Sequence, residues 1–276
     1  RRDIACVLVN PLQALHPNRG APGDSTLVDG SRRAGFDRQA YADWLRRLRQ
    51  VCDEAGIVLI LDEVFVGFRL APGGAQEYFG IRADMVCYGK TLGGGLPVGV
   101  VCGRRELMRR YDPKRPADLC FARGTFNAHP YVMGAMNVFL RAMDTPEVRR
   151  LYEGLDERWA AHARAFNEAL AGAGHPVRVE ALSTIWTVTY TQASRYHWML
   201  QFYLREQGLA LSWVGTGRFI FNLSYGDDEM AEVRRRFLAA CEAMRHDGWW
   251  WQGPALTRGA IARQLAGEMI RARLGR

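Results

Sequence analysis

The chain has 276 residues, of which 48% are hydrophobic and 24% are charged, and its formal net charge is +8. This balance is typical of a globular protein with one large domain or two modest ones. No apolar run approaches the roughly 20 residues that span a bilayer, and residues 1–3 do not resemble the start of a signal peptide.

The positive charge is spread along the chain and does not form one basic block. Arginines alternate with acidic residues, as between Asp43 and Asp53, and no nucleic-acid-binding signature is present. The six cysteines lack C-x-x-C spacing and the six histidines are scattered, so we expect no metal site. Cysteines within apolar segments indicate reduced thiols and a cytoplasmic protein. From the charge distribution and the missing signatures, we expect no nucleic-acid or membrane partner.

The first part of the chain alternates strand-like and helical segments. The uninterrupted apolar run at 57–61 is typical of a strand buried on both faces of a sheet. Gly56 ends the helix before it, which Asp37 caps. The predicted elements are a strand at 4–9, a helix at 37–55, strands at 57–61, 85–88 and 98–102, and a helix that begins at Pro130. This order predicts an α/β fold with a mostly parallel sheet.

A second α/β part follows a change of pattern near Asp144. Its predicted elements are one long helix from Val148 to Leu170, strands at 177–182 and 185–190, a helix at 194–207, strands at 209–213 and 218–223, and a helix from Asp227. We therefore predict a large domain at 1–144, a smaller α/β domain at 145–248 and a helical tail at 249–276.

Lys90 is unusual because only two of the 37 lysines and arginines are lysines. Codon bias explains the scarcity of lysine, but not why one remains in the glycine-rich turn at 89–95. Arginine can replace lysine as a charge but not as a nucleophile, because its guanidinium group stays protonated. The other lysine, Lys114, lies in a predicted exposed loop.

Asp62 follows the apolar run, and Lys90 follows the strand at 85–88. Since the ends of parallel strands meet at one edge of a sheet, the two side chains can face one cavity. A lysine and an acid placed in this way suit pyridoxal phosphate, because the amine forms a Schiff base and the acid holds the pyridine nitrogen protonated. Taken singly, Asp62 is better explained as a helix cap or salt-bridge partner, and Lys90 as a surface cation.

The segment 89–91 (Gly-Lys-Thr) also matches the end of a P-loop motif, whose first glycine would fall at position 84. Asp84 stands there instead, and its carboxylate would repel the phosphates that such a loop binds. A nucleotide site is therefore not expected.

Three motifs follow one another in order: LDEVFVGFR at 61–69, GGAQEYFG at 73–80 and YGKTLGGGLPVG at 88–99. Together they closely resemble the class III PLP-dependent aminotransferases, above all glutamate-1-semialdehyde 2,1-aminomutase and related biosynthetic aminotransferases. The resemblance implies the α/β fold of the PLP-dependent transferases, fold type I. It also implies that residues 1–144 are the C-terminal part of the large PLP-binding domain.

The resemblance implies a role for several residues. Lys90 would form the Schiff base with the cofactor and later move a proton, Asp62 would pair with the pyridine nitrogen, and Val64 would pack on one ring face. Gly124 and Thr125 belong to a segment whose threonine reaches the cofactor phosphate of the neighbouring subunit, which would make the active unit a homodimer. A turn hydroxyl before the Pro130 helix is the alternative for Thr125.

Several positions depart from the family pattern. Asn10 replaces a glutamate in the usual Val-Glu-Pro, and 127–130 (Asn-Ala-His-Pro) replaces a more usual Gly-Asn-Pro. Phe65 stands where many relatives have glutamine, although the aminomutase branch is also apolar there. Arg69 and Arg218 are candidates for binding a substrate carboxylate by position alone, and a surface salt bridge explains each of them better.

We therefore expect an enzyme that transfers an amino group between a small amino donor and an aldehyde or keto acceptor, either between molecules or as an aminomutase. Relatives carry a long segment before residue 4, so we expect a fragment or a split enzyme completed by an upstream segment or a separate chain. The alternative is a catalytically incomplete protein that acts as a structural partner. Racemisation or decarboxylation on the same scaffold is a third possibility, because the fold alone does not select the reaction.

Overall fold

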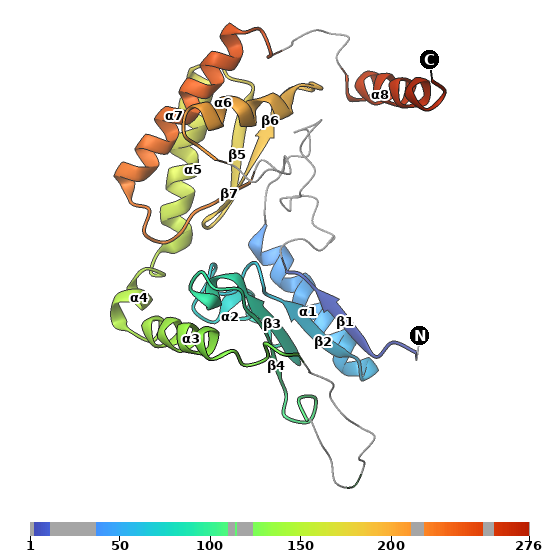
Figure 1. Cartoon of the computed structure of the whole chain (residues 1–276), viewed down its shortest axis with the longest axis vertical. Coiled ribbons are helices and arrows are strands. Elements are labelled where there is room, and N and C mark those ends of the chain that lie inside the picture. Colours follow the sequence, from blue (N-terminus) through green and yellow to red (C-terminus); the bar gives the residue numbers. More distant parts are fainter. Residues whose placement is uncertain are drawn as a thin grey trace. The chain divides into compact units, whose positions relative to one another are not determined.

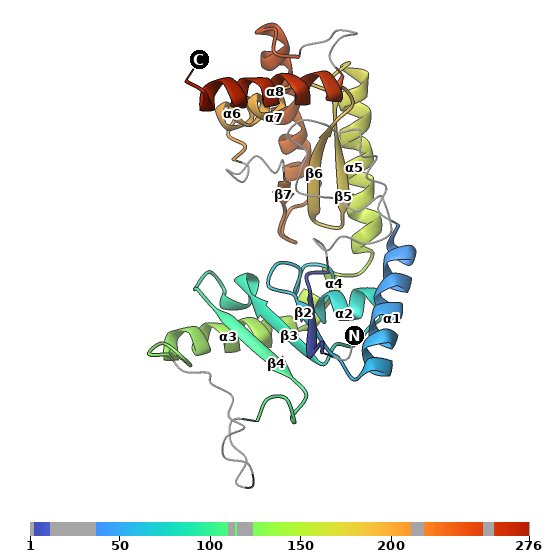
Figure 2. The ribbon, with the colours of Figure 1, turned by 90° about the vertical axis from the view of Figure 1, so that its right-hand side faces the viewer.

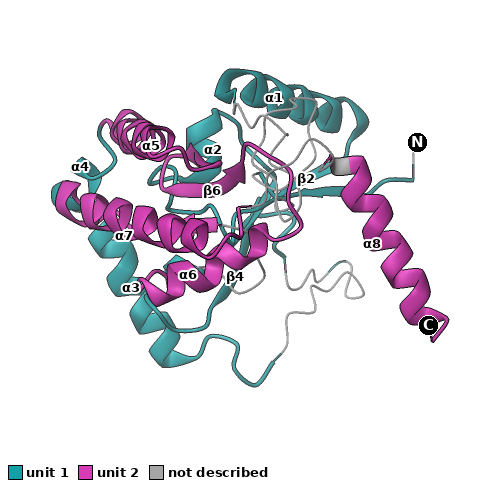
Figure 3. Cartoon of the chain, turned by 90° about the horizontal axis from the view of Figure 1, so that it is seen from above, with its two compact units in different colours: residues 1–18, 37–153 teal, residues 19–36, 154–276 magenta. Residues whose placement is uncertain are grey.

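The computed structural model describes residues 3–11, 37–109, 114, 124–210, 218–250 and 257–275. The described residues form two compact units, one that extends to Glu153 and one that starts at Gly154 (Figure 3). We describe each unit by itself.

Unit 1 is built on a four-stranded sheet in the order β1-β2-β3-β4 (Figure 1). The strands are β1 (Cys6–Val9), β2 (Val58–Asp62), β3 (Met85–Gly89) and β4 (Gly99–Gly103). The first three strands are parallel, and β4 runs antiparallel to β3. The predicted mostly parallel sheet is therefore confirmed, and β2 extends one residue further than the apolar run, so that it includes Asp62.

Five helical segments accompany this sheet: α1 (Arg38–Ala55), α2 (Gly74–Phe79), the 3-10 helix η1 (Lys90–Gly93), α3 (Pro130–Met143) and α4 (Pro146–Arg150). As predicted, Asp37 caps α1 by accepting the Ala40 amide, and Gly56 ends it in the left-handed conformation with φ 66°. Figure 2 shows α1 alongside the strands of this unit.

The core of unit 1 lies between α1 and the first three strands. Leu59 and Leu61 of β2 are fully buried and pack with Cys52 of α1 and Val86 of β3. Val58 and Ile60 on the other face of β2 are only partly buried, so burial on both faces is wrong for the described part of the chain. None of the residues of α3 is buried.

Unit 2 combines a three-stranded antiparallel sheet with helices. Its elements are α5 (Leu155–Gly172), β5 (Val177–Leu182), β6 (Ile185–Tyr190), a 3-10 turn (His197–Met199), α6 (Leu200–Glu206), β7 (Arg218–Ile220), α7 (Asp227–His246) and α8 (Arg258–Arg273). Its core contains Trp159 stacked on Phe221 at 5.1 Å, and Phe166 against Phe237 at 5.1 Å between ring centroids.

The single helix predicted from Val148 to Leu170 is wrong. The structure has α4 and α5 instead, separated by a turn at 151–154, whose last residue, Gly154, adopts the left-handed conformation with φ 59°. Two other predictions were also too long. The helix at 194–207 shortens to the 3-10 turn plus α6, and the strand at 218–223 shortens to β7. The strand predicted at 209–213 lies largely outside the described residues.

Within the described ranges, no helix combines the length and the hydrophobicity that a transmembrane helix requires.

Candidate active site

The C-terminal ends of β2 and β3 lie side by side in the sheet of unit 1. Asp62 is paired with Cys87, and the amide of Glu63 donates to the carbonyl oxygen of Cys87 at 2.9 Å. Lys90 follows directly after β3. The structure thus places Asp62 and Lys90 at the same edge of the sheet, which is where ligands bind in open α/β sheets.

Asn10 lies at this edge as well. Val9 is registered with Leu61, so that Asn10 follows β1 where Asp62 ends β2. A neutral amide therefore lies on the β1 side of Asp62, at the position where the family pattern has a carboxylate.

The backbone of Lys90 is in an uncommon conformation. Its φ is +46°, which lies in the left-handed region that residues other than glycine rarely adopt. The residue is exposed, and its Nζ lies 5.7 Å from the centroid of the Phe65 ring. Strain of this kind persists only where the surrounding structure imposes it, and it is concentrated at functional sites.

The turn after β2 packs against the residue before Lys90. A Cβ atom added to Gly89 would lie 3.2 Å from Cγ1 of Val64 and 3.0 Å from the carbonyl oxygen of Val98. The glycine therefore allows the β2 turn to approach the end of β3 closely. The carboxylate of Asp62 accepts the Val64 amide at 3.0 Å, which fixes the start of this turn.

Three side chains donate hydrogen bonds to carbonyl oxygens of the residues that follow, 65–68. Thr91 Oγ1 donates to the carbonyl oxygen of Gly67 at 3.2 Å, Arg69 Nε donates to that of Phe65 at 2.8 Å, and the Tyr152 hydroxyl donates to that of Phe68 at 2.7 Å. The Thr91 bond links the turn directly to the residue after Lys90. Burial lowers the pKa of Arg69, and its Nε is already bound to the backbone, so this arginine has a structural role in the turn.

Glu63 is a buried residue of the site that the sequence analysis did not assign. It is 1% exposed, and its carboxylate accepts the amides of Ala75 at 2.6 Å and Gln76 at 3.2 Å. Burial raises its pKa to about 7, against the opposing effect of these two hydrogen bonds. The sequence shows an acid directly after an apolar run, but it does not reveal the backbone amides of α2 that this acid binds.

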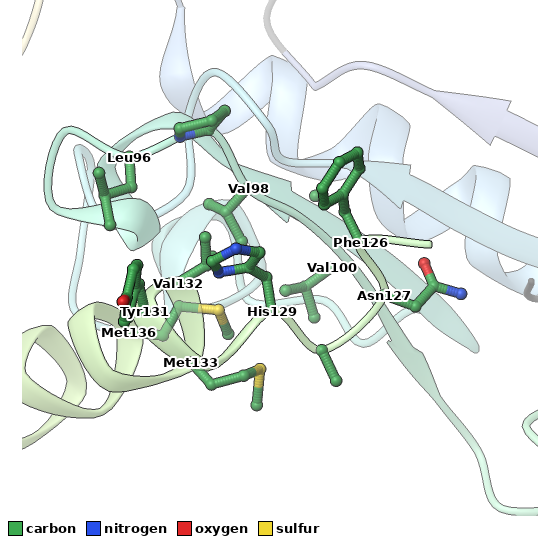
Figure 4. A pocket seen from close by; sticks show the side chains of 13 residues that line it. Leu96, Val98, Val100, Phe126, Asn127, His129, Tyr131, Val132, Met133 and Met136 are labelled. Atoms are coloured by element: carbon green, nitrogen blue, oxygen red, sulfur yellow. The ribbon is translucent and has the colours of Figure 1, made fainter. Parts of the chain in front are cut away.

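Gly124 and Thr125 lie in an exposed turn before α3, where the carbonyl oxygen of Gly124 accepts the Asn127 amide at 3.1 Å. The residues that follow border a largely apolar cavity of about 540 Å³ (Figure 4). It is lined by 96–100, from the end of the glycine-rich turn into β4, and by 126–129, 131–133 and 136, from the turn into α3. In Figure 4 the His129 ring lies between Val98 and Met133.

The other candidate arginine, Arg218, lies in β7 of unit 2. Its side chain is buried, so the surface position expected for it is wrong.

Comparison with known proteins identifies the relatives of this chain. The Aminotransferase class-III family matches residues 30–240. The chain is 40% identical over 190 residues to glutamate-1-semialdehyde 2,1-aminomutase of Nitratidesulfovibrio vulgaris, which corresponds to 69% of this chain and 39% of that protein. The chain therefore spans about two fifths of the length of this curated relative.

Solved structures show the same fold. A transaminase with PLP bound superposes with a TM-score of 0.68 at 28% identity, over 90% of this chain and 54% of that one. An omega-transaminase from Sphaerobacter thermophilus gives a TM-score of 0.67 at 25% identity, over 87% of this chain and 52% of that one. The predicted fold class, fold type I of the PLP-dependent transferases, is confirmed.

Proposed function

Because the chain belongs to the class-III aminotransferase family, we propose that it carries the lysine-bearing part of a PLP-dependent enzyme that transfers an amino group. The substrates would be a small amino donor and an aldehyde or keto acceptor. The observation that carries this proposal is the position of Lys90 beside Asp62, at the ends of adjacent parallel strands.

The residues at this edge fit the cofactor. Lys90 supplies an exposed amine for its aldehyde, Asp62 a carboxylate for its ring nitrogen, and Val64 an apolar surface for its ring. Pyridoxal phosphate, when bound, supplies an aromatic ring that accepts electrons from the substrate. In our proposal the Lys90 amine then moves the proton at the reacting carbon, while the braced turn keeps Val64 in place.

We further propose that the active unit is a homodimer. Gly124 and Thr125 lie in an exposed turn, as expected of residues that reach a phosphate group bound by a neighbouring subunit. The phosphate cup would come from an upstream segment or a separate chain, because the matched part of this chain covers only 39% of the curated relative. A cytoplasmic location is supported by the buried free thiols of Cys52 and Cys241.

The aminomutase relatives favour an intramolecular exchange of an amino group, and the transaminase structures favour an intermolecular one. Both reactions use the same lysine and acid. Measuring whether a single amino aldehyde is isomerised without an added acceptor distinguishes them, in the chain combined with the segment that supplies the phosphate cup.

The two lysines of the chain provide a direct test. We expect pyridoxal phosphate to give a visible absorption band with the 276-residue chain, and borohydride reduction to attach the cofactor to Lys90. Lys90→Ala should abolish the adduct, and Lys114→Ala is the matched control that should retain it. An adduct on Lys114 alone, or no difference between the two variants, would contradict the proposed function. A purely structural partner would bind no cofactor at Lys90.

A further inference from the structure

Glu63 binds three segments of unit 1, namely α2, β3 and the turn at 64–67. Its carboxylate accepts two amides at the start of α2, its own amide donates to Cys87 of β3, and its carbonyl oxygen accepts the Gly67 amide at 2.8 Å. The turn closed by the Gly67 bond carries Val64 and Phe65. A change at Glu63 therefore acts on both ends of the turn that borders Lys90.

Gly74 makes room for the carboxylate of Glu63. A Cβ atom at Gly74 would lie 2.0 Å from Oε2 of Glu63, and the residue has φ +73°. No side chain fits at position 74 while the carboxylate stays where it is. The local backbone is thus shaped around Glu63.

The surroundings of Glu63 disfavour its charge. Two titratable groups of neighbouring elements feel this carboxylate: burial and, more weakly, the Glu63 charge raise the pKa of Tyr88 of β3 and of Cys102 of β4. An apolar side chain would be less costly to bury at this position than a carboxylate. The two amides that the carboxylate binds are the compensating gain, because a buried amide without an acceptor is itself costly.

We propose that Glu63 is a positioning residue, whose hydrogen bonds to Ala75 and Gln76 hold the turn at 64–67 in place and thereby fix Val64 and Phe65 beside Lys90. This inference rests on the proposed function of Lys90. Glu63 acts through the turn and not on the substrate, because both of its oxygens are bound to the backbone of α2.

The chain offers a conservative variant and a matched control. Glu63→Gln keeps one acceptor oxygen but turns an NH₂ group toward the second amide, and it removes the titration. Glu77→Gln changes a carboxylate of α2, the helix that Glu63 binds; the Glu77 carboxylate accepts the Gly73 amide at 2.6 Å in an exposed position. Both variants should fold, as measured by circular dichroism.

The readout is the ratio of borohydride-trapped pyridoxal phosphate on Lys90 to that on Lys114, measured from pH 6 to pH 8.5. The second lysine serves as an internal reference for the reagent. At pH 8 we expect Glu63→Gln to lower the ratio about fivefold, the factor that corresponds to one lost hydrogen bond. In the wild type the ratio should also rise as Glu63 ionises near pH 7, and this step should be absent in Glu63→Gln but present in Glu77→Gln.

The two proposals fail in different ways. Wild-type chain without any adduct at Lys90 would overturn the proposed function, and this inference with it. An adduct ratio and pH profile unchanged in Glu63→Gln would overturn this inference alone and leave Glu63 with a structural role. Should Glu63→Gln not fold, hydrogen exchange of the Gly67, Ala75 and Gln76 amides in the wild type decides. Protection that does not change between pH 6 and pH 8 would contradict the positioning role.

Discussion

Asp84, the residue directly before β3, forms an ion pair with Arg49 of α1, in which Oδ2 of Asp84 lies 2.7 Å from Nη1 of Arg49. The same carboxylate oxygen accepts the Leu59 amide at 2.7 Å, and Arg104 binds the other oxygen at 2.8 Å. Asp84 thus joins α1, β2 and the segment after β4 at the opposite end of β3 from Lys90. This explains why a carboxylate stands at the position where a P-loop would need glycine.

We expect Asp84→Ala to destabilise unit 1 by about 3 kcal/mol, because removing one partner of a buried pair leaves the other without compensation. Asp84 is 4% exposed and the side chain of Arg49 is 14% exposed. Urea unfolding followed by circular dichroism measures the change. The control is Asp43→Ala, which removes the exposed partner of Arg46 and should have little effect. Equal losses in the two variants would contradict the role of Asp84.

Stability should depend on pH through Glu63. Burial raises its pKa from 4.5 to about 7 in the folded chain, so the unfolded chain releases this proton first as the pH rises. Its contribution to the free energy of unfolding therefore falls between about pH 4.5 and pH 7, at about 1.4 kcal/mol per pKa unit, and is constant above. The difference between wild type and Glu63→Gln in urea unfolding at pH 5 and pH 7.5 isolates this effect. A difference that is the same at both pH values would refute it.

The opposite dependence is expected for Asp84. Burial raises its pKa, but the hydrogen bonds from Leu59 and Arg49 outweigh this and hold the pKa below its usual value. Its stabilising effect is present above the usual pKa of the unfolded chain and is lost as the pH falls through the lower folded value. Acid unfolding of the wild type should therefore begin at a lower pH than that of Asp84→Asn, which keeps one acceptor oxygen but carries no charge. Coincident acid transitions would argue against this.

Gly74 is the first residue of α2 and Gly80 follows its last one, and both have similar left-handed conformations, with φ +73° and +66°. An added Cβ would meet the Glu63 carboxylate at Gly74 but nothing within 4 Å at Gly80. Gly80→Ala should cost about 1 kcal/mol from the backbone alone. Gly74→Ala should cost more, because it also displaces the Glu63 carboxylate from its two amides. Chemical denaturation of the two variants compares them directly, and equal losses would show that the carboxylate tolerates displacement.

The sequence pattern located the strands of unit 1 and the edge where Asp62 and Lys90 meet, because apolar runs and their ends depend on local composition. It did not show the division between α4 and α5. The apolar spacing of Val148 and Leu151 continues in phase with that of α5, but the helix is interrupted by the turn at 151–154, which ends in the left-handed Gly154. A glycine in a helical pattern does not reveal its φ angle from sequence alone.

Glu63 could not be assigned from its own neighbours in the sequence, because its partners lie 12 and 13 residues further along the chain. Contacts of this kind depend on how α2 packs after the turn. The family pattern pointed to Gly124 and Thr125, but their expected partner is a phosphate group bound by another subunit. Their role therefore stays a prediction that a single chain does not test.

Lys90 combines a reactive amine with a strained backbone, and substitution can separate the two. With φ +46°, glycine should fit this position better than alanine, so Lys90→Gly should be more stable than Lys90→Ala by about 1 kcal/mol. Neither variant should trap pyridoxal phosphate, because neither has an amine at position 90. Urea unfolding of both variants, with the adduct yield measured in parallel, checks the two effects. If alanine proved as stable as glycine, the backbone at position 90 would not be strained. A preserved adduct would show that the amine lies elsewhere.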